Sequence, residues 1–192
     1  NILSVVEEAA QEVFVPMTVG GGIRTIEDIV AALRSGADKV AVNTAAIARP
    51  EFLSEAAKIF GSQCVVLSVE AKRRAPGQWE ALTDNGRETS GIDVLDWVVE
   101  AERLGVGEIL LTSVDMEGTQ RGFDKELIAA VRERVQVPVI ACGGAGQIDD
   151  VVDLVTESEC DAVCCASIFH YDVAAIREVK EALVAAGHGA RL

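Results

Sequence analysis

Two patterns of apolar residues alternate along this chain. Short runs rich in Val, Ile, Leu and Ala are followed by longer segments in which apolar residues recur every three or four positions. Continuous apolar runs of this kind are typical of parallel strands covered on both faces of a sheet. Strands are therefore predicted at residues 13–19, 39–42, 64–69, 109–112, 137–141 and 162–166.

The segments between these runs predict amphipathic helices. Thr25 begins the first one, because Asp28 lies three residues later and completes a capping box, while Ile26, Ile29 and Leu33 form an apolar stripe. Further helices are predicted at residues 50–60, 92–104, 124–135, 147–155 and 173–185.

One connection is longer than the others. Residues 73–90 contain Asp84-Asn85-Gly86 between two short extended runs. Asn-Gly in this setting is a strong signal for a tight hairpin turn. The connection is therefore predicted to project from the sheet as a small β-hairpin flap.

The chain also resembles itself. Residues 16–19 followed by Gly-Gly match residues 138–141 followed by Cys-Gly-Gly, an offset of 138 − 16 = 122. Asp38 and Asp161 occupy equivalent places one strand later, an offset of 161 − 38 = 123. Such self-similarity predicts a duplicated half-barrel.

Repeated strand, loop and helix units predict an α/β fold of the TIM (βα)8 barrel type. Eight such units take about 250 residues, whereas this chain has 192 residues, six predicted strands, an opening helix and a first residue that is Asn. We therefore expect one domain over residues 1–192, an incomplete barrel of six βα units without its amino-terminal βαβ portion. A six-stranded open sheet is the alternative.

Charge, hydropathy and cysteine content exclude several classes of partner and cofactor. The formal net charge of −14 argues against nucleic acid as a partner, because phosphate backbones need a basic face. No apolar run approaches the roughly 20 residues of a membrane helix.

Neither a cofactor nor a metal site is expected, and the five cysteines without C-x-x-C spacing are interpreted as small buried thiols in a reducing cytoplasm. They are Cys64, Cys142, Cys160, Cys164 and Cys165.

Two glycine turns follow predicted strands. Gly20–Gly22 leads into the helix that begins at Thr25, and backbone N–H groups at such a helix start favour a phosphate. The turn is repeated at Gly143-Gly144, and Thr44 and Ser167 are each placed one strand later to donate a hydroxyl. Two such turns in one barrel predict a substrate that carries two phosphates.

Carboxylates also lie where strands are predicted to end. Glu70 follows an apolar strand, so it is interpreted as a general acid and base with a raised pKa, or else as a strand-end acid paired with Lys72. Glu117 is a second carboxylate or a residue of a mobile lid. Lys39 and Glu108 begin their strands at the opposite mouth, where an ion pair is expected to stabilise the barrel.

Together these residues resemble the family of cyclase subunits of imidazole glycerol phosphate synthase, from histidine biosynthesis. Thr18-Val-Gly-Gly-Gly-Ile and Glu70-Ala-Lys-Arg are two of the matching stretches. The resemblance covers nearly the whole chain. Its stretches are residues 18–23, 36–40, 43–46, 60–63, 70–73, 107–113, 115–124 and 166–170.

The resemblance implies a reaction and a partner. In this family a glutaminase subunit, forming a heterodimer with the barrel, supplies ammonia. The barrel then splits and closes a bis-phosphorylated ribulosyl-formimino-aminoimidazole carboxamide ribonucleotide. The products are imidazole glycerol phosphate and aminoimidazole carboxamide ribonucleotide.

The resemblance also assigns roles by position. Glu70 and Glu117 fall on catalytic or active-site aspartates of the family, and Lys39, Glu108 and Arg191 fall on a charged ring through which ammonia enters. The remaining positions bind the substrate and its phosphates. They are Gly21, Gly22, Asn43, Thr44, Thr112, Gly118, Gly143, Gly144, Ala166 and Ser167.

Three departures from the family keep other functions open. Glu stands at both aspartate positions. The extra methylene shifts the carboxylate by roughly 1 Å, which lowers the reaction rate by about 10²-fold if nothing compensates for it. Cys142 replaces a usual serine, and the family's other catalytic aspartate lies on the missing first strand, so these residues alone are expected to be poorly active. The alternatives are a paralogous ammonia-using subunit in surface-sugar amidation and a non-catalytic scaffold that conducts ammonia.

Overall fold

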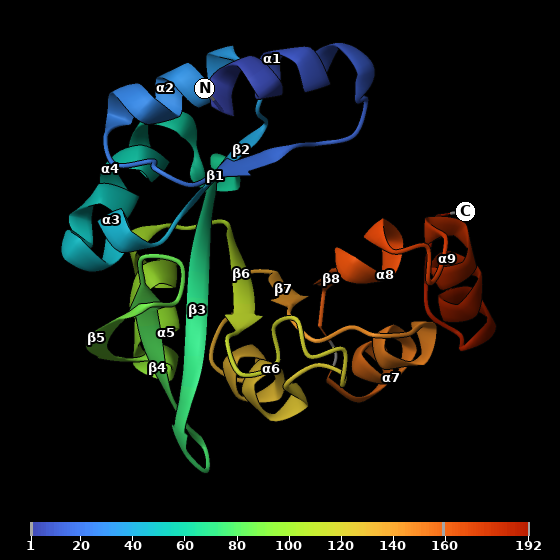
Figure 1. The fold of residues 1–192 in the computed structure, drawn as a ribbon. Coiled ribbons are helices and arrows are strands. Elements are labelled where there is room, and N and C mark those ends of the chain that lie inside the picture. The colour runs from blue at the N-terminus through green and yellow to red at the C-terminus, as the bar shows by residue number, and fades with distance from the viewer. Residues whose placement is uncertain (1, 159, 192) are drawn as a thin grey trace.

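The sheet at the centre of the molecule is parallel and curled. The computed structural model describes residues 2–158 and 160–191, and Figure 1 shows its strands lying side by side with helices outside them. Neighbouring strands follow the order β1-β2-β3-β6-β7-β8, and every pair along this path is parallel. The strands are β1 (Thr18–Gly20), β2 (Lys39–Val42), β3 (Val65–Ala75), β6 (Glu108–Ser113), β7 (Val139–Cys142) and β8 (Ala162–Cys164).

Helices connect successive strands and cover the outer face of the sheet (Figure 1). Residues at alternate strand positions, such as Leu67, Ile109 and Leu111, are buried against them with Phe52 and Leu127. Within the described residues no helix is both long and apolar enough to cross a lipid bilayer. The helices are α1 (Ile2–Glu12), α2 (Ile26–Arg34), α3 (Thr44–Ala48), α4 (Glu51–Phe60), η1 (Ser62–Cys64, a 3₁₀ turn), α5 (Val94–Leu104), α6 (Lys125–Arg132), α7 (Ile148–Ser158), α8 (Ser167–His170) and α9 (Ile176–Ala185).

The curled sheet remains open in the part of the chain that the structure describes. Strand β1 pairs only with β2, and β8 pairs only with β7. In Figure 1 the two ends of the sheet stand apart. This arrangement confirms the predicted incomplete TIM-type barrel of six βα units, and it leaves the concave inner face accessible at its carboxyl end.

The predicted hairpin is present, and it changes the boundary of a strand. Strands β4 (Gln78–Thr83) and β5 (Glu88–Asp93) are antiparallel, and β4 also pairs with β3 from Glu70 to Ala75. The prediction that β3 ends at Glu70 is therefore wrong. The backbone of β3 beyond Ala71 loses its parallel neighbour but continues as a strand because β4 supplies the hydrogen bonds.

The internal duplication is visible in two pairs of aspartates. The carboxylates of Asp28 and Asp150, separated by 150 − 28 = 122 positions, each accept two backbone N–H groups from the residues three and four positions earlier, at 2.8 to 3.0 Å. Asp38 accepts the backbone N–H of Met17, just before β1, at 2.7 Å, and Asp161 accepts that of Val139, the first residue of β7, at 2.9 Å. The two halves therefore repeat their caps as well as their sequence.

Candidate functional site

Four polar side chains form one row across the inner face of the sheet. The strand register pairs Glu70 with Thr112, Thr112 with Cys142, and Cys142 with Cys164. Register partners on parallel strands direct their side chains to the same face. The row therefore places a carboxyl, a hydroxyl and two thiols side by side near the carboxyl ends of β3, β6, β7 and β8, where sites of α/β enzymes lie.

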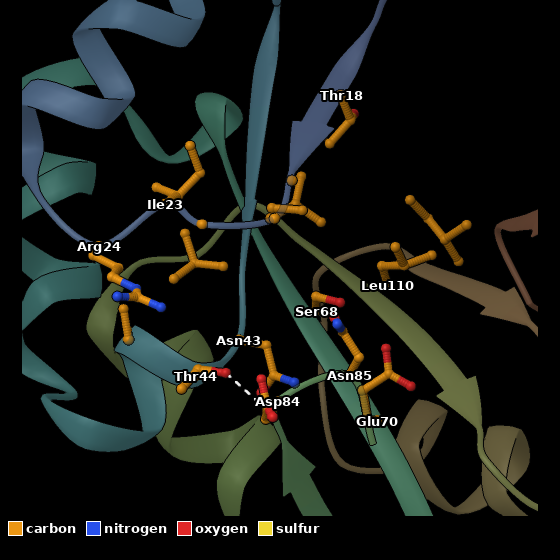
Figure 2. A pocket seen from close by; sticks show the side chains of 18 of the residues that line it. Thr18, Ile23, Arg24, Asn43, Thr44, Ser68, Glu70, Asp84, Asn85 and Leu110 are labelled. Atoms are coloured by element: carbon orange, nitrogen blue, oxygen red, sulfur yellow. Dashed lines mark hydrogen bonds between the residues drawn. The ribbon is translucent and has the colours of Figure 1, made fainter. Parts of the chain in front are cut away.

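A cavity of about 760 Å³ opens in front of this inner face. Its walls include the glycine turn after β1, Asn43 and Thr44 after β2, Glu70 on β3, the hairpin tip and Cys164 on β8. Figure 2 shows the side chains of Asn43, Thr44, Asn85 and Glu70 around the same space. The structure thus brings the glycine turn of the first half and the candidate catalytic carboxyl to one cavity.

The glycine turn of the first half is open to this cavity. Gly21 and Gly22 have φ angles of 92° and 79°, which L side chains rarely adopt, and a Cβ added at either would meet no atom within 4 Å. Arg24 lines the cavity beside them (Figure 2). A guanidinium next to exposed backbone N–H groups suits an anion. Sequence reasoning missed Arg24, although its place directly after the glycine turn was a usable signal.

Asn43 and Thr44 hold the hairpin in place. The Asn43 side-chain amide donates to the Leu82 carbonyl at 3.0 Å, and the Thr44 hydroxyl accepts the Asp84 backbone N–H at 3.1 Å (Figure 2). Among the described atoms, the Asn43 Oδ1 is buried without a hydrogen-bond partner. The two residues therefore shape the cavity wall by fixing the hairpin against it.

Glu70 lies where a carboxyl group resists ionisation. Its side chain is half-buried, and burial, followed by the negative charge of Glu117, raises its pKa above the ordinary 4.5. Lys72 does not neutralise it, because the Lys72 ammonium forms an ion pair with Asp115. The alternative reading of Glu70 as the ion-pair partner of Lys72 is therefore not what the structure shows.

The raised pKa of Glu70 predicts a pH-dependent stability. The native state holds the Glu70 proton to higher pH than the unfolded state, so wild-type stability falls as pH rises through the native pKa. Glu70→Gln has no such loss, so the variant is expected to be more stable than wild type at neutral pH. The difference should close as pH falls below the ordinary pKa. Urea denaturation of both proteins between about pH 4 and about pH 8 measures this, and equal stability at all pH values would contradict it.

The second glycine turn is covered by protein. A Cβ added at Gly144 would lie 2.0 Å from the Gly122 carbonyl oxygen, and the Gly122 N–H donates to the Gly144 carbonyl at 2.9 Å. A Cβ at Gly143 would lie 3.0 Å from the Glu117 carboxylate. The loop of residues 114–122 therefore packs directly onto this turn.

The remaining candidate residues form a neighbouring cluster. The Ser167 hydroxyl donates to the Ala145 carbonyl at 3.4 Å, beside the second glycine turn. Gly118 has a φ of 73° and open space at its Cβ position. These residues, with Thr112, Glu117, Gly143, Gly144 and Ala166, do not line the 760 Å³ cavity. Glu70 therefore lines the cavity, and Thr112, its register partner, lies next to it without lining that cavity.

At the opposite end of the sheet, Lys39 and Glu108 form the ion pair expected from the sequence. Both side chains are partly buried, at 26% and 21% exposure. Arg191 is exposed in the tail after α9 and makes no ion pair among the described residues. The structure thus brings Lys39 and Glu108 together and leaves Arg191 apart from them.

Known proteins share this sequence over almost its whole length. Residues 1–175 match the model of a family described as histidine biosynthesis protein. The chain belongs to this family. It is 53% identical over 193 residues to the imidazole glycerol phosphate synthase subunit HisF of Mycobacteroides abscessus, which covers 97% of this chain and 75% of that protein. It is 50% identical over 190 residues to the HisF subunit of Streptococcus sanguinis, with 99% and 75% covered.

The cysteines of this family member differ in their exposure. Cys160 is buried, Cys64, Cys142 and Cys165 are half-buried, and Cys164 is exposed. The prediction of buried thiols is therefore wrong for Cys164, because β8 is the last strand of the described sheet and leaves this side chain uncovered. Within the described residues no three His, Cys, Asp or Glu side chains are grouped to hold a metal ion.

Proposed function

We propose that this chain is the cyclase subunit of imidazole glycerol phosphate synthase. Its substrate would be the bis-phosphorylated ribulosyl-formimino-aminoimidazole carboxamide ribonucleotide. With ammonia as the nitrogen source, it would form imidazole glycerol phosphate and aminoimidazole carboxamide ribonucleotide. Membership of the histidine biosynthesis family and two relatives named HisF support this reaction over sugar amidation.

The observation that carries the proposal is the shared cavity of Glu70 and the open glycine turn. One phosphate would bind the backbone N–H groups of Gly21 and Gly22, with Arg24 supplying positive charge. This anchoring would hold the reacting part of the substrate over the row that contains Glu70. A carboxyl with a raised pKa keeps its proton to higher pH than an ordinary carboxyl, so it can give a proton as well as take one during ring closure.

Glu117 would assist Glu70 from the neighbouring loop. Its negative charge contributes to the raised pKa of Glu70, so it helps to keep a proton available there. It also lies against Gly143, at the edge of the second cluster. The second phosphate would bind in this cluster, at Gly118, Gly143, Gly144, Ala166 and Ser167, and the loop of residues 114–122 would have to move for it to enter.

The partner would be a glutaminase subunit that docks at the amino-terminal end of the strands. The partly buried ion pair of Lys39 and Glu108 lies there, on the same inner face as Glu70. Ammonia released at that end would pass along the inner face to the row at the carboxyl end. Arg191 would join the docking surface from the tail. The location would be cytoplasmic, because five free cysteines are compatible with a reducing compartment.

Replacing Lys39 with alanine is expected to lower turnover with glutamine more than turnover with ammonium ions. Without Lys39, the Glu108 carboxylate is left unpaired at the proposed entrance. The transfer of ammonia from the glutaminase should therefore slow more than the reaction with free ammonia. Glutamine-dependent turnover is expected to fall at least about tenfold more than turnover with ammonium ions, a coupling loss of about 1.4 kcal/mol. Equal losses with both nitrogen sources would contradict the proposed entrance.

The proposed reaction is tested by identifying the products. The full-length protein is incubated with the ribulosyl-formimino substrate and ammonium ions, and both products are separated by chromatography. Formation of imidazole glycerol phosphate supports the proposal. Absence of turnover, together with ammonia-dependent amination of a sugar nucleotide, would replace it with the paralogous function.

A further inference from the structure

Cys142 and Cys164 face each other on neighbouring strands. They are direct register partners of β7 and β8, and adjacent strands lie about 4.8 Å apart. Disulfides join residues whose Cα atoms are roughly 4.4 to 6.8 Å apart. Both side chains point to the inner face, because register partners on parallel strands share a face. The register therefore places the two Cα atoms at a separation that a disulfide can span.

The two thiols have different environments. Cys164 is exposed and lines the 760 Å³ cavity, whereas Cys142 is half-buried between β6 and β8. The hydrogen bond from the Cys142 thiol lowers the pKa of Cys164 to about 7. The same hydrogen bond, followed by burial, raises the pKa of Cys142. Cys164 is therefore the accessible thiol that ionises first, and nucleophilic attack by sulfur requires the thiolate.

We propose that Cys142 and Cys164 form a dithiol modification site, which low-molecular-weight disulfides such as oxidised glutathione convert to an intramolecular disulfide. The Cys164 thiolate attacks one sulfur of oxidised glutathione, and one glutathione thiolate leaves. Cys142 then attacks the Cys164 sulfur and displaces the second glutathione. The protons of the two cysteines end on the two glutathione thiols, and the two electrons of the protein thiols reduce the reagent.

The other cysteines are poorly placed to take part. Cys165 follows Cys164 in the chain but lies on the opposite face, where it packs against the core and borders a cavity with α7 and α9. Cys160 is buried before β8, and Cys64 lies at the other end of β3. Cys165 therefore provides a matched control, because it is the adjacent thiol with the opposite orientation.

Oxidation would alter the row of polar side chains at the carboxyl end of the sheet. Thr112 is the register partner of Cys142 on one side and of Glu70 on the other. A disulfide would tie β7 to β8 and withdraw two thiols from the inner face. The chemical modification itself does not depend on the proposed cyclase function, because it is measured on the thiols.

The experiment treats the folded protein with oxidised glutathione, alkylates the remaining thiols and digests with trypsin and an Asp-specific protease. Cleavage before Asp149 and Asp161 separates Cys142 from Cys164. Wild type and Cys165→Ser are expected to lose two more thiols than untreated samples and to give a peptide pair linked through Cys142 and Cys164. Urea denaturation of each protein checks that it remains folded.

The single variants report the two steps separately. Cys142→Ser is expected to stop at a stable glutathione adduct on Cys164, since no second thiol displaces it. Cys164→Ser is expected to form neither the adduct nor the linked peptides. A persistent glutathione adduct on wild type, linkage through Cys160 or Cys165, or no loss of thiols would each overturn the proposal.

Discussion

Replacing Glu70 with glutamine is expected to lower kcat for ammonia-dependent ring closure by roughly 10²–10⁴-fold, with little change in KM. Glutamine keeps the size of the side chain and its place beside the cavity, but it cannot donate and accept the proton. The phosphates are proposed to bind elsewhere, at the glycine turns, so substrate affinity should remain. Steady-state kinetics with saturating ammonium ions measure both parameters.

Glu70→Asp is the matched control for this variant. It keeps an ionisable carboxyl and withdraws it by roughly 1 Å, so its kcat should lie well above that of Glu70→Gln. Two outcomes would remove Glu70 from the proton transfer. One is a kcat for Glu70→Gln within a few-fold of wild type, and the other is a loss confined to KM, which would indicate a binding role.

Replacing Gly144 with alanine is expected to destabilise the fold by roughly 2–5 kcal/mol. About 1–2 kcal/mol comes from a side chain at positive φ, and about 1–3 kcal/mol comes from overpacking. The overpacking arises because the new Cβ would lie 2.0 Å from the Gly122 carbonyl oxygen, a backbone atom that cannot turn aside. Urea denaturation followed by circular dichroism measures the loss.

Gly22→Ala is the control, because Gly22 is the equivalent turn residue of the first half. It also has a positive φ, but its added Cβ meets nothing within 4 Å, so a loss of only about 1–2 kcal/mol is expected. Equal destabilisation by the two variants would mean that the loop of residues 114–122 does not rest on Gly144 in solution.

Local signals in the sequence predicted most of the secondary structure. The capping box at Thr25 is present, with both of its hydrogen bonds. The Asp84-Asn85-Gly86 turn has positive φ at all three residues, a conformation that Asn, Asp and Gly adopt more readily than other residues. Helix α5 begins two residues later than predicted because Asp93 caps it, accepting the N–H groups of Leu95 and Asp96. Such features depend on residues that are close in the chain, so the sequence predicts them without knowledge of the tertiary structure.

The candidate site was predictable only in part. Gly22 and Asn43 follow two strands and Glu70 lies on a third, so the parallel arrangement places them toward one edge of the sheet, and all three line the same cavity. Their roles in binding and catalysis remain predictions. The hydrogen bonds of Asn43 and Thr44 to the hairpin were not foreseeable, because they join residues 39 and 40 positions apart.

The sequence by itself determined the α/β units, their duplication and the glycine turns, because each rests on periodicity or on a conformation that few residues adopt. Tertiary structure alone decided three other properties: the row that joins Glu70 to Cys164, the extension of β3 along β4, and the difference between the open and the covered glycine turn. These depend on strand register and on which loop packs where. Register and packing are set by contacts between distant residues, and no local pattern encodes them.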